Sequence, residues 1–219
     1  MGIAAFLSYS HRNKKIAAKI MAEMEKYGFD VFLAHEHIRV SADWEKEILR
    51  RLQSCEVFFA LLTRAFDTSD WTHQEIGIAY ANGCVMIPIK ARENPVGFMA
   101  KYQGIRLDRN NIEQTAWKVV QSIATQSPRL GREIRWALIR QVENAPSYIE
   151  AGWVLGKLAN IDSLKATEVE TVLQLASSNN QVYGAYLASR PLRELMNKHK
   201  AHIREPILKK FLSVWAYEL

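Results

Sequence analysis

The pair of residues whose types and spacing best suit chemistry is Trp71 and Glu75. Residues four apart lie on one face of a helix, so a helix over 71–81 would set the carboxylate beside the indole. An apolar neighbour partly desolvates a carboxylate and raises its pKa, which suits catalysis. The alternative is that Glu75 is an ordinary acid in a first helical turn, stabilised by the helix dipole.

A second group of polar side chains, at residues 8–11, could contact a ligand. Ser8, Tyr9 and Ser10 carry hydroxyl groups, and they end an apolar run that begins at Ile3. His11 or the following arginine could meet a phosphate. A plain polar strand end explains the same residues equally well.

Several other kinds of site are excluded or disfavoured by the sequence. It contains no Gly-rich nucleotide loop, no His-Glu-x-x-His and no Cys-x-x-Cys. The histidine pairs His35/His37 and His199/His202 lack acidic or cysteine ligands at metal spacing, so we expect no metal. The two cysteines, Cys55 and Cys84, adjoin apolar runs, and we interpret them as free, buried thiols rather than reactive nucleophiles.

The first 125 residues alternate between strand and helix patterns. Short apolar runs predict strands at Ile3–Ser8, Phe29–Leu33, Val57–Leu62, Val85–Ile89 and Ile105–Leu107. Amphipathic spacing predicts helices at Lys14–Tyr27, from Trp44 to Leu52, at Trp71–Ala81 and at Asn111–Thr125. This alternation is typical of βαβ units and a parallel sheet. Ligands of such sheets bind beyond the carboxyl ends of the strands, where the polar residues of this part of the chain gather.

The pattern changes after residue 126, where strand-like runs end. Helices are predicted at Leu130–Val142, Tyr148–Leu158, Val169–Ala176, Val182–Ala188, Leu192–His199 and Ile207–Trp215. Thr167 and Glu170 fit a capping box, and Pro146, Pro191 and Pro206 are expected at helix starts. We therefore predict two domains, an α/β domain over 1–126 and an all-helical domain over 127–219.

Composition narrows the class of protein. Hydrophobic residues make up 48% and charged residues 24% of the chain, which is typical of a globular protein. The net charge of +6 is not concentrated in a basic block, so we expect no nucleic-acid partner. No run is long enough to span a membrane, and the first residues do not form a signal-peptide pattern. We expect a cytoplasmic protein without a membrane partner.

Residues 3–125 resemble the Toll/interleukin-1 receptor (TIR) domain family in its prokaryotic branch. The first two strands carry the matches Ala5–Ser10 and Gly28–Leu33, and Trp44–Ile48 resembles the start of the following helix. Ser69–Ile76 is similar to the W-x-x-x-E motif, and Val85–Ile89 is similar to the fourth strand. Each match alone is weak, but the ordered set is specific.

The resemblance implies a flavodoxin-like α/β sandwich with a five-stranded parallel sheet in the order 2-1-3-4-5. It also implies that Glu75 is the essential acid of an enzyme that cleaves NAD at the nicotinamide–ribose bond. Ser8, Tyr9, Ser10, His11 and Trp71 would contact NAD, which is a substrate, so no separate cofactor is expected. The Ala34–Ala42 loop departs from the family pattern, because Ala34 and Ser41 replace a frequent Asp and Gly.

Two functions follow from the resemblance. The first is an NAD glycohydrolase or cyclase of prokaryotic immune signalling or antiviral defence, which assembles through TIR–TIR contacts and whose product a downstream effector protein could sense. The alternative is a non-catalytic TIR scaffold that acts through TIR–TIR contacts alone. The presence of both Trp71 and Glu75 favours the enzyme, since a scaffold does not need that pair.

Overall fold

The computed structural model describes residues 2–33 and 42–215. The chain divides into two compact units, Met1–Glu133 and Ile134–Leu219, which we call the sheet unit and the helical unit. The division falls inside a helix, α6 (Pro128–Asn144). The domain boundary expected at 126/127 stays a prediction.

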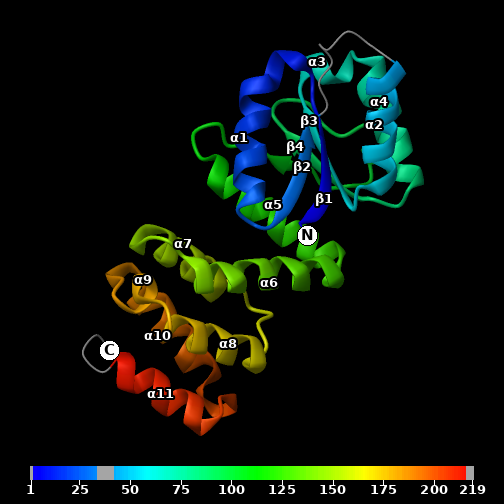
Figure 1. Ribbon diagram of the computed structural model, residues 1–219. Coiled ribbons are helices and arrows are strands. Elements are labelled where there is room, and N and C mark those ends of the chain that lie inside the picture. Colours follow the sequence, from blue (N-terminus) through cyan, green and yellow to red (C-terminus); the bar gives the residue numbers. More distant parts are fainter. Residues whose placement is uncertain (1, 34–41, 216–219) are drawn as a thin grey trace. The chain divides into compact units, whose positions relative to one another are not determined.

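The sheet unit is built on five parallel strands (Figure 1). The strands are β1 (Ile3–Ser8), β2 (Phe29–Leu33), β3 (Val57–Leu62), β4 (Val85–Lys90) and β5 (Ile105–Arg106). Their order is β2-β1-β3-β4-β5, and every neighbouring pair is parallel. The predicted fold class is confirmed. The order reverses between β1 and β3, so the crevice at their carboxyl ends is where such a sheet binds ligands.

Helices cover both faces of this sheet (Figure 1). One face carries α1 (Lys14–Glu25) and α5 (Ile112–Gln126), which contact each other and the strands β2 and β4. The other face carries α2 (Ala42–Ser54) and α4 (Asp70–Ala81), with the short α3 (Arg64–Asp67) between β3 and α4. Because both faces are covered, β3 is buried along its whole length, as its continuous apolar run predicts.

Alternation along β1 decides which side chains meet α4. Successive residues of a strand point to opposite faces, so Phe6 and Ser8 share a face. Phe6 belongs to the core cluster on the α2/α4 side, together with Phe58, Leu52 and Ile76. The last residue of β1, Ser8, therefore points toward α4.

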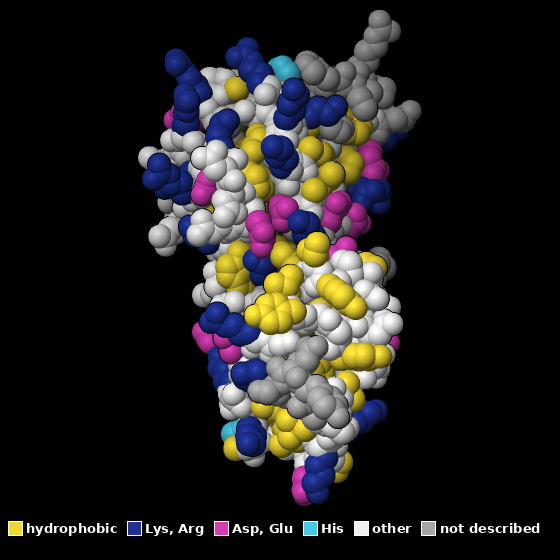
Figure 2. Space-filling view, turned by 90° about the vertical axis from the view of Figure 1, so that its left-hand side faces the viewer, with side chains coloured by type: hydrophobic (Ala, Val, Ile, Leu, Met, Phe, Trp, Pro, Cys, Tyr) yellow, Lys and Arg dark blue, Asp and Glu magenta, His cyan; other side chains and the backbone are white. Residues whose placement is uncertain are grey.

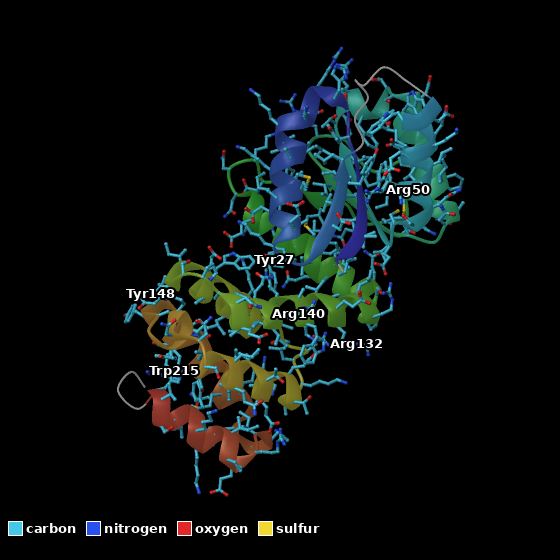
Figure 3. The ribbon with its side chains drawn as sticks, in the orientation of Figure 1. Tyr27, Arg50, Arg132, Arg140, Tyr148 and Trp215 are labelled. Atoms are coloured by element: carbon cyan, nitrogen blue, oxygen red, sulfur yellow. The ribbon has the colours of Figure 1, made fainter. Side chains whose placement is uncertain are left out.

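The opposite core is closed at the end of α1. Tyr27, labelled in Figure 3, stacks on Trp117 of α5 with 6.0 Å between ring centroids. Gly28 follows with a φ of +87°, a left-handed conformation that glycine adopts without strain. The chain can thus turn directly from α1 into β2.

As far as residue 215, where the described part of the chain ends, the helical unit contains the rest of α6 and five further α-helices. They are α7 (Tyr148–Ala159), α8 (Ala166–Ala176), α9 (Asn180–Tyr183), α10 (Tyr186–His199) and α11 (Glu205–Trp215). Its most extensive helix pairing joins α7 to α10, and α8 packs on both α10 and α11. Trp215, labelled in Figure 3, is buried and stacks on Phe211 with 5.6 Å between centroids.

Two predictions for this region are wrong. Helix α10 begins at Tyr186 and runs through Pro191, which was expected to start a helix. Residues 182–188 are not one helix, because α9 ends at Tyr183 and the chain turns at Gly184-Ala185. The loss of one backbone donor at Pro191 is tolerated inside a helix whose buried face packs on α7.

The capping box expected from Thr167 to Glu170 is also displaced. Glu168 accepts a hydrogen bond of 2.8 Å from the backbone N–H of Lys165, the residue that precedes α8. Glu170 instead accepts from the backbone and the guanidinium of Arg204. The residue that caps α8 is therefore Lys165, two positions before the Thr167 that the sequence motif indicates.

None of the helices within residues 2–33 and 42–215 is both long enough and apolar enough to cross a bilayer.

Candidate functional site

The centre of the candidate site is a hydrogen bond between the end of β1 and α4. The hydroxyl of Ser8 donates to Oε2 of Glu75, and both side chains are buried. Only 4% of Glu75 is exposed. A buried carboxylate keeps its charge only when hydrogen bonds or charges compensate the lost water, and Ser8 supplies one such bond.

The start of α4 is fixed so that Glu75 faces the sheet. Ser69 occupies the position before the helix. Thr72 is buried, and its hydroxyl donates to the carbonyls of Phe66 and Ser69 at 2.7 and 2.8 Å. These bonds tie the first turn of α4 to the preceding α3. Glu75 lies three residues further on, so the same contacts orient its side chain.

The other residues predicted to contact a ligand follow Ser8 directly. Tyr9 and Ser10 are buried, and His11 is partly exposed at the start of a short 3₁₀ helix, His11–Asn13. All of them lie at the carboxyl end of β1, next to the strand order reversal. Among them, Ser8 donates the hydrogen bond to Glu75 described above. The roles of Ser8, Tyr9, Ser10 and His11 toward a ligand stay predictions.

Two residues of this edge were missed by sequence reasoning. The hydroxyl of Thr63, at the end of β3, donates to Oδ1 of Asn13 at 3.0 Å. Thr63 also caps α3 by accepting from the backbone N–H of Phe66 at 3.2 Å. The turns after β1 and β3 are therefore joined across the reversal point. The sequence shows that polar residues follow β3 at positions 63–70. It does not show that Thr63 bonds to Asn13.

Trp71 lies one helical turn before Glu75 on α4. Its side chain is not part of the core, because 38% of the residue is exposed. Trp71 and Glu75 thus lie on one helix, as their spacing predicts, and the structure adds that Glu75 is buried whereas Trp71 is exposed. An exposed indole beside a buried carboxylate offers an apolar surface on which a flat ring could stack.

Two further segments are relevant to the site: the loop that follows β2 and the segment around Phe98. The predicted loop Ala34–Ala42, with Ala34 and Ser41, lies outside the residues whose side chains are described. The segment at Phe98 forms a short 3₁₀ helix, Gly97–Met99, in which Met99 and not Phe98 is buried. Phe98 stacks on Tyr80 of α4 with 4.8 Å between ring centroids, so this segment packs on α4.

The edge that carries the site is bordered by basic side chains. Arg12, Lys14 and Arg64 are exposed near the ends of β1 and β3. On the face drawn in Figure 2, Lys and Arg side chains gather over the upper part of the sheet unit. Positive charge near a crevice attracts anionic ligands, such as phosphate groups.

The described part of the chain has no set of side chains that could hold a metal ion. Among residues 2–33 and 42–215, no group of three His, Cys, Asp or Glu side chains is arranged to hold an ion. The candidate site therefore consists of one carboxylate, hydroxyl groups, an indole and nearby cations.

Comparison with known proteins shows the family of the chain. A family model described as the TIR domain matches residues 5–121, just over half of the chain. The chain belongs to the TIR domain family, in agreement with its sheet order. A search of curated proteins gives no match. The matched range includes the last four residues of β1, all of α4 and both Ser8 and Glu75.

Proposed function

We propose that this protein cleaves NAD at the bond between nicotinamide and ribose, with Glu75 as the catalytic carboxylate. The observation that carries the proposal is the buried hydrogen bond from Ser8 to Glu75 at the strand order reversal. A carboxylate held in a fixed position and shielded from water stabilises positive charge more strongly than a solvated one.

The chemistry suits a single negative group. When the bond breaks, nicotinamide leaves with the bonding electron pair and becomes neutral, while positive charge develops on the ribose. Glu75 would stabilise that charge, as carboxylates do in glycoside cleavage. Attack by water gives ADP-ribose and releases one proton. Attack by a nucleophile within the same molecule gives a cyclic isomer instead.

The surrounding residues match the parts of NAD. The exposed face of Trp71 would supply an apolar wall for a flat ring, and Tyr9 and Ser10, which follow Ser8 in the chain, would supply hydroxyl groups. His11 and Arg12 come directly after this turn in the chain, and we propose that they meet the pyrophosphate. NAD is then the substrate, and no separate cofactor is required.

We further propose a setting for this activity. The family match supports assembly through contacts between TIR domains, and the function would belong to prokaryotic immune signalling or antiviral defence in the cytoplasm. A downstream effector protein would sense the product. The alternative is a TIR scaffold without catalysis, which would have no use for a buried, hydrogen-bonded Glu75.

The decisive experiment is incubation of concentrated protein with NAD, followed by chromatography. Release of nicotinamide separates the enzyme from the scaffold, and the second product separates hydrolysis from cyclisation. Glu75→Gln keeps the size and the acceptor for Ser8 but removes the charge, so the rate should fall roughly 100- to 1,000-fold. Glu150→Gln, which alters an exposed glutamate of α7, is the matched control and should retain full activity.

The outcomes are distinguishable. Folding is checked by comparing melting curves, since Gln in place of Glu75 preserves the packing of α4. Absence of nicotinamide release by folded wild-type protein at high concentration would contradict the proposal. Full activity of folded Glu75→Gln would leave an enzyme but remove its central residue.

A further inference from the structure

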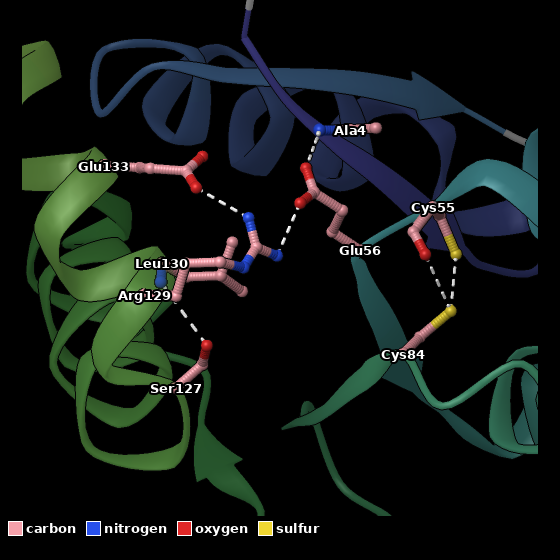
Figure 4. Close-up of polar contacts among 8 residues, drawn as sticks. All are labelled: Ala4, Cys55, Glu56, Cys84, Ser127, Arg129, Leu130 and Glu133. Atoms are coloured by element: carbon pink, nitrogen blue, oxygen red, sulfur yellow. Dashed lines mark hydrogen bonds and ion pairs between the residues drawn. The ribbon is translucent and has the colours of Figure 1, made fainter.

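The two cysteines of the chain meet in the sheet unit. Sγ of Cys55 lies 2.9 Å from Sγ of Cys84, so a hydrogen bond joins the two thiols (Figure 4). That separation is within about 1 Å of a disulfide bond length. Both cysteines are buried, with exposed fractions of 8% and 7%. Both are free and buried thiols, as the sequence predicts, but their contact across 29 residues of chain was not foreseen.

The backbone on both sides of the pair is fixed by the sheet. Cys55 precedes β3 and Cys84 precedes β4, and these strands pair in parallel from Val57 and Val85 onward. Neighbouring strands lie about 4.8 Å apart, and disulfides span Cα separations of roughly 4.4–6.8 Å. A disulfide therefore fits between the two strand starts without a large movement of the backbone.

Glu56 holds the backbone between Cys55 and Val57 (Figure 4). Its N–H donates to the carbonyl of Ala4 at 2.8 Å, and its carbonyl accepts from Val85 at 2.9 Å. Its carboxylate accepts from the backbone of Ala4 and from the guanidinium of Arg129. Because these hydrogen bonds fix the backbone of Glu56, the neighbouring Cys55 loses little further conformational entropy when the S–S bond forms.

The two thiols differ in their acidity. The hydrogen bond to Cys84, together with burial, raises the pKa of Cys55 above its ordinary value. The same hydrogen bond lowers the pKa of Cys84, because the proton retained on Cys55 stabilises a thiolate on its neighbour. Since a thiolate is the nucleophile, Cys84 is the sulfur suited to attack an oxidant.

We propose that Cys55 and Cys84 form a reversible intramolecular disulfide when the protein meets a hydroperoxide. Nothing in the proposed NAD chemistry uses these residues. They lie at the amino ends of β3 and β4, whereas Ser8 and Glu75 lie at the carboxyl-end edge of the sheet.

The reaction proceeds in two steps. The Cys84 thiolate attacks one peroxide oxygen, the O–O bond breaks, and a sulfenic acid and one hydroxide form. Cys55 then loses its proton and attacks the Cys84 sulfur, so that the S–S bond forms and hydroxide leaves. The two hydroxides take up the two thiol protons as water. In total, two thiols are oxidised by two electrons and one hydrogen peroxide is reduced to two waters.

The test uses the full chain and hydrogen peroxide. Reduced protein is treated with peroxide, quenched, alkylated with a maleimide and weighed by mass spectrometry. We expect loss of two hydrogens, no maleimide adduct, a single chain on a non-reducing gel and full reversal by dithiothreitol. The six methionines can also take up oxygen, so the Cys55→Ser/Cys84→Ser variant provides the background.

Single variants assign the attacking sulfur. In Cys55→Ser, the sulfenic acid on Cys84 cannot be resolved and should be trapped by a 1,3-diketone. In Cys84→Ser, the remaining thiol should react at least tenfold more slowly. Oxidised wild-type protein should melt about 5–10 °C higher than reduced protein, because the disulfide closes a loop of about 30 residues.

Several results would overturn the proposal. They are covalent dimers, sulfinic or sulfonic acid on the wild-type protein in place of a disulfide, thiols that stay alkylatable after peroxide treatment, and equal reaction rates of the two single variants. Circular dichroism of each sample confirms that the reaction occurs in folded protein.

Discussion

The hydroxyl of Ser8 donates a hydrogen bond to Oε2 of Glu75, although the two residues are 67 positions apart. The bond joins the last residue of the first strand to the middle of α4. The bond also satisfies the hydroxyl group of Ser8, which is fully buried. A carboxylate whose direction is fixed in advance need not reorganise when charge develops beside it.

Ser8→Ala should therefore reduce catalysis while the site stays assembled. Removing a hydrogen bond to a charged group costs about 1.5–3 kcal/mol, or roughly 10- to 100-fold in rate. Ser8 acts through Glu75 as a positioning residue, so kcat should fall much more than KM rises. Steady-state kinetics with NAD measure both constants. Ser189→Ala, which alters a buried serine of α10, is the control and should leave both unchanged. A rise in KM with unchanged kcat would show that Ser8 binds substrate instead.

Trp71→Ala should weaken NAD binding with little loss of stability. Stacking of a base on an aromatic side chain is worth about 1–3 kcal/mol, so we expect KM to rise roughly tenfold and Trp71→Phe to recover part of the loss. Trp136→Ala is closely matched, because 37% of Trp136 is exposed, against 38% of Trp71. An equal effect of both substitutions on KM would indicate a general loss of structure and no contact with NAD.

Specific activity should rise with protein concentration. The exposed indole of Trp71 leaves an apolar surface next to Glu75, and a neighbouring TIR domain could cover it and exclude water from the site. We expect at least a severalfold rise in activity per molecule across a hundredfold concentration range. Light scattering on the same samples should show larger assemblies where activity is high. Constant specific activity over that range would argue for a monomer that is complete by itself.

Much of the sheet unit could be predicted from local patterns. The bounds of β1, β2 and β3 match the predicted ranges residue for residue, because short apolar runs between turn residues are unambiguous. The helical unit was less predictable. The residues before and after Pro191 have the same amphipathic spacing, so the pattern alone does not show that α10 passes through the proline.

In the candidate site, the residues could be found from the sequence, whereas the contacts between them could not. The motif that contains Glu75 and the polar turn after β1 could each be found in the sequence. Alternation with Phe6 even indicates the face on which Ser8 lies. The hydrogen bonds Ser8–Glu75 and Thr63–Asn13 could not be foreseen, because each depends on how two distant turns approach across the sheet.

Glu168→Ala should strongly destabilise the helical unit. Nε of Arg135 donates to both oxygens of Glu168 at 3.0 and 3.2 Å, and the side chains are only 12% and 5% exposed. Loss of one partner leaves a buried charge uncompensated and costs about 3–5 kcal/mol. Glu194→Ala breaks the exposed pair with Arg190 and should cost far less, because solvent screens exposed charges. Urea unfolding followed by tryptophan fluorescence measures both. Similar losses for the two variants would mean that burial does not decide the strength of these pairs.

The ion pair of Glu170 and Arg204 should make stability depend on pH. Hydrogen bonds from the guanidinium and the backbone N–H of Arg204 hold the pKa of Glu170 below its usual value of 4.5. A carboxyl whose pKa is lower in the folded than in the unfolded protein stabilises the fold above the unfolded pKa. That contribution is lost as the pH falls through the lower, folded pKa.

Glu170→Gln should therefore melt at a lower temperature than wild type at pH 7, and the two melting temperatures should converge as the pH is lowered below about 4.5. Arg204→Ala should show the same convergence, since it removes the other partner of the same pair. Melting curves between pH 3 and pH 7 measure the difference directly. A difference between wild type and Glu170→Gln that stays constant over this range would show that the carboxylate charge does not contribute, and that Glu170 acts only through its size and its hydrogen-bond acceptors.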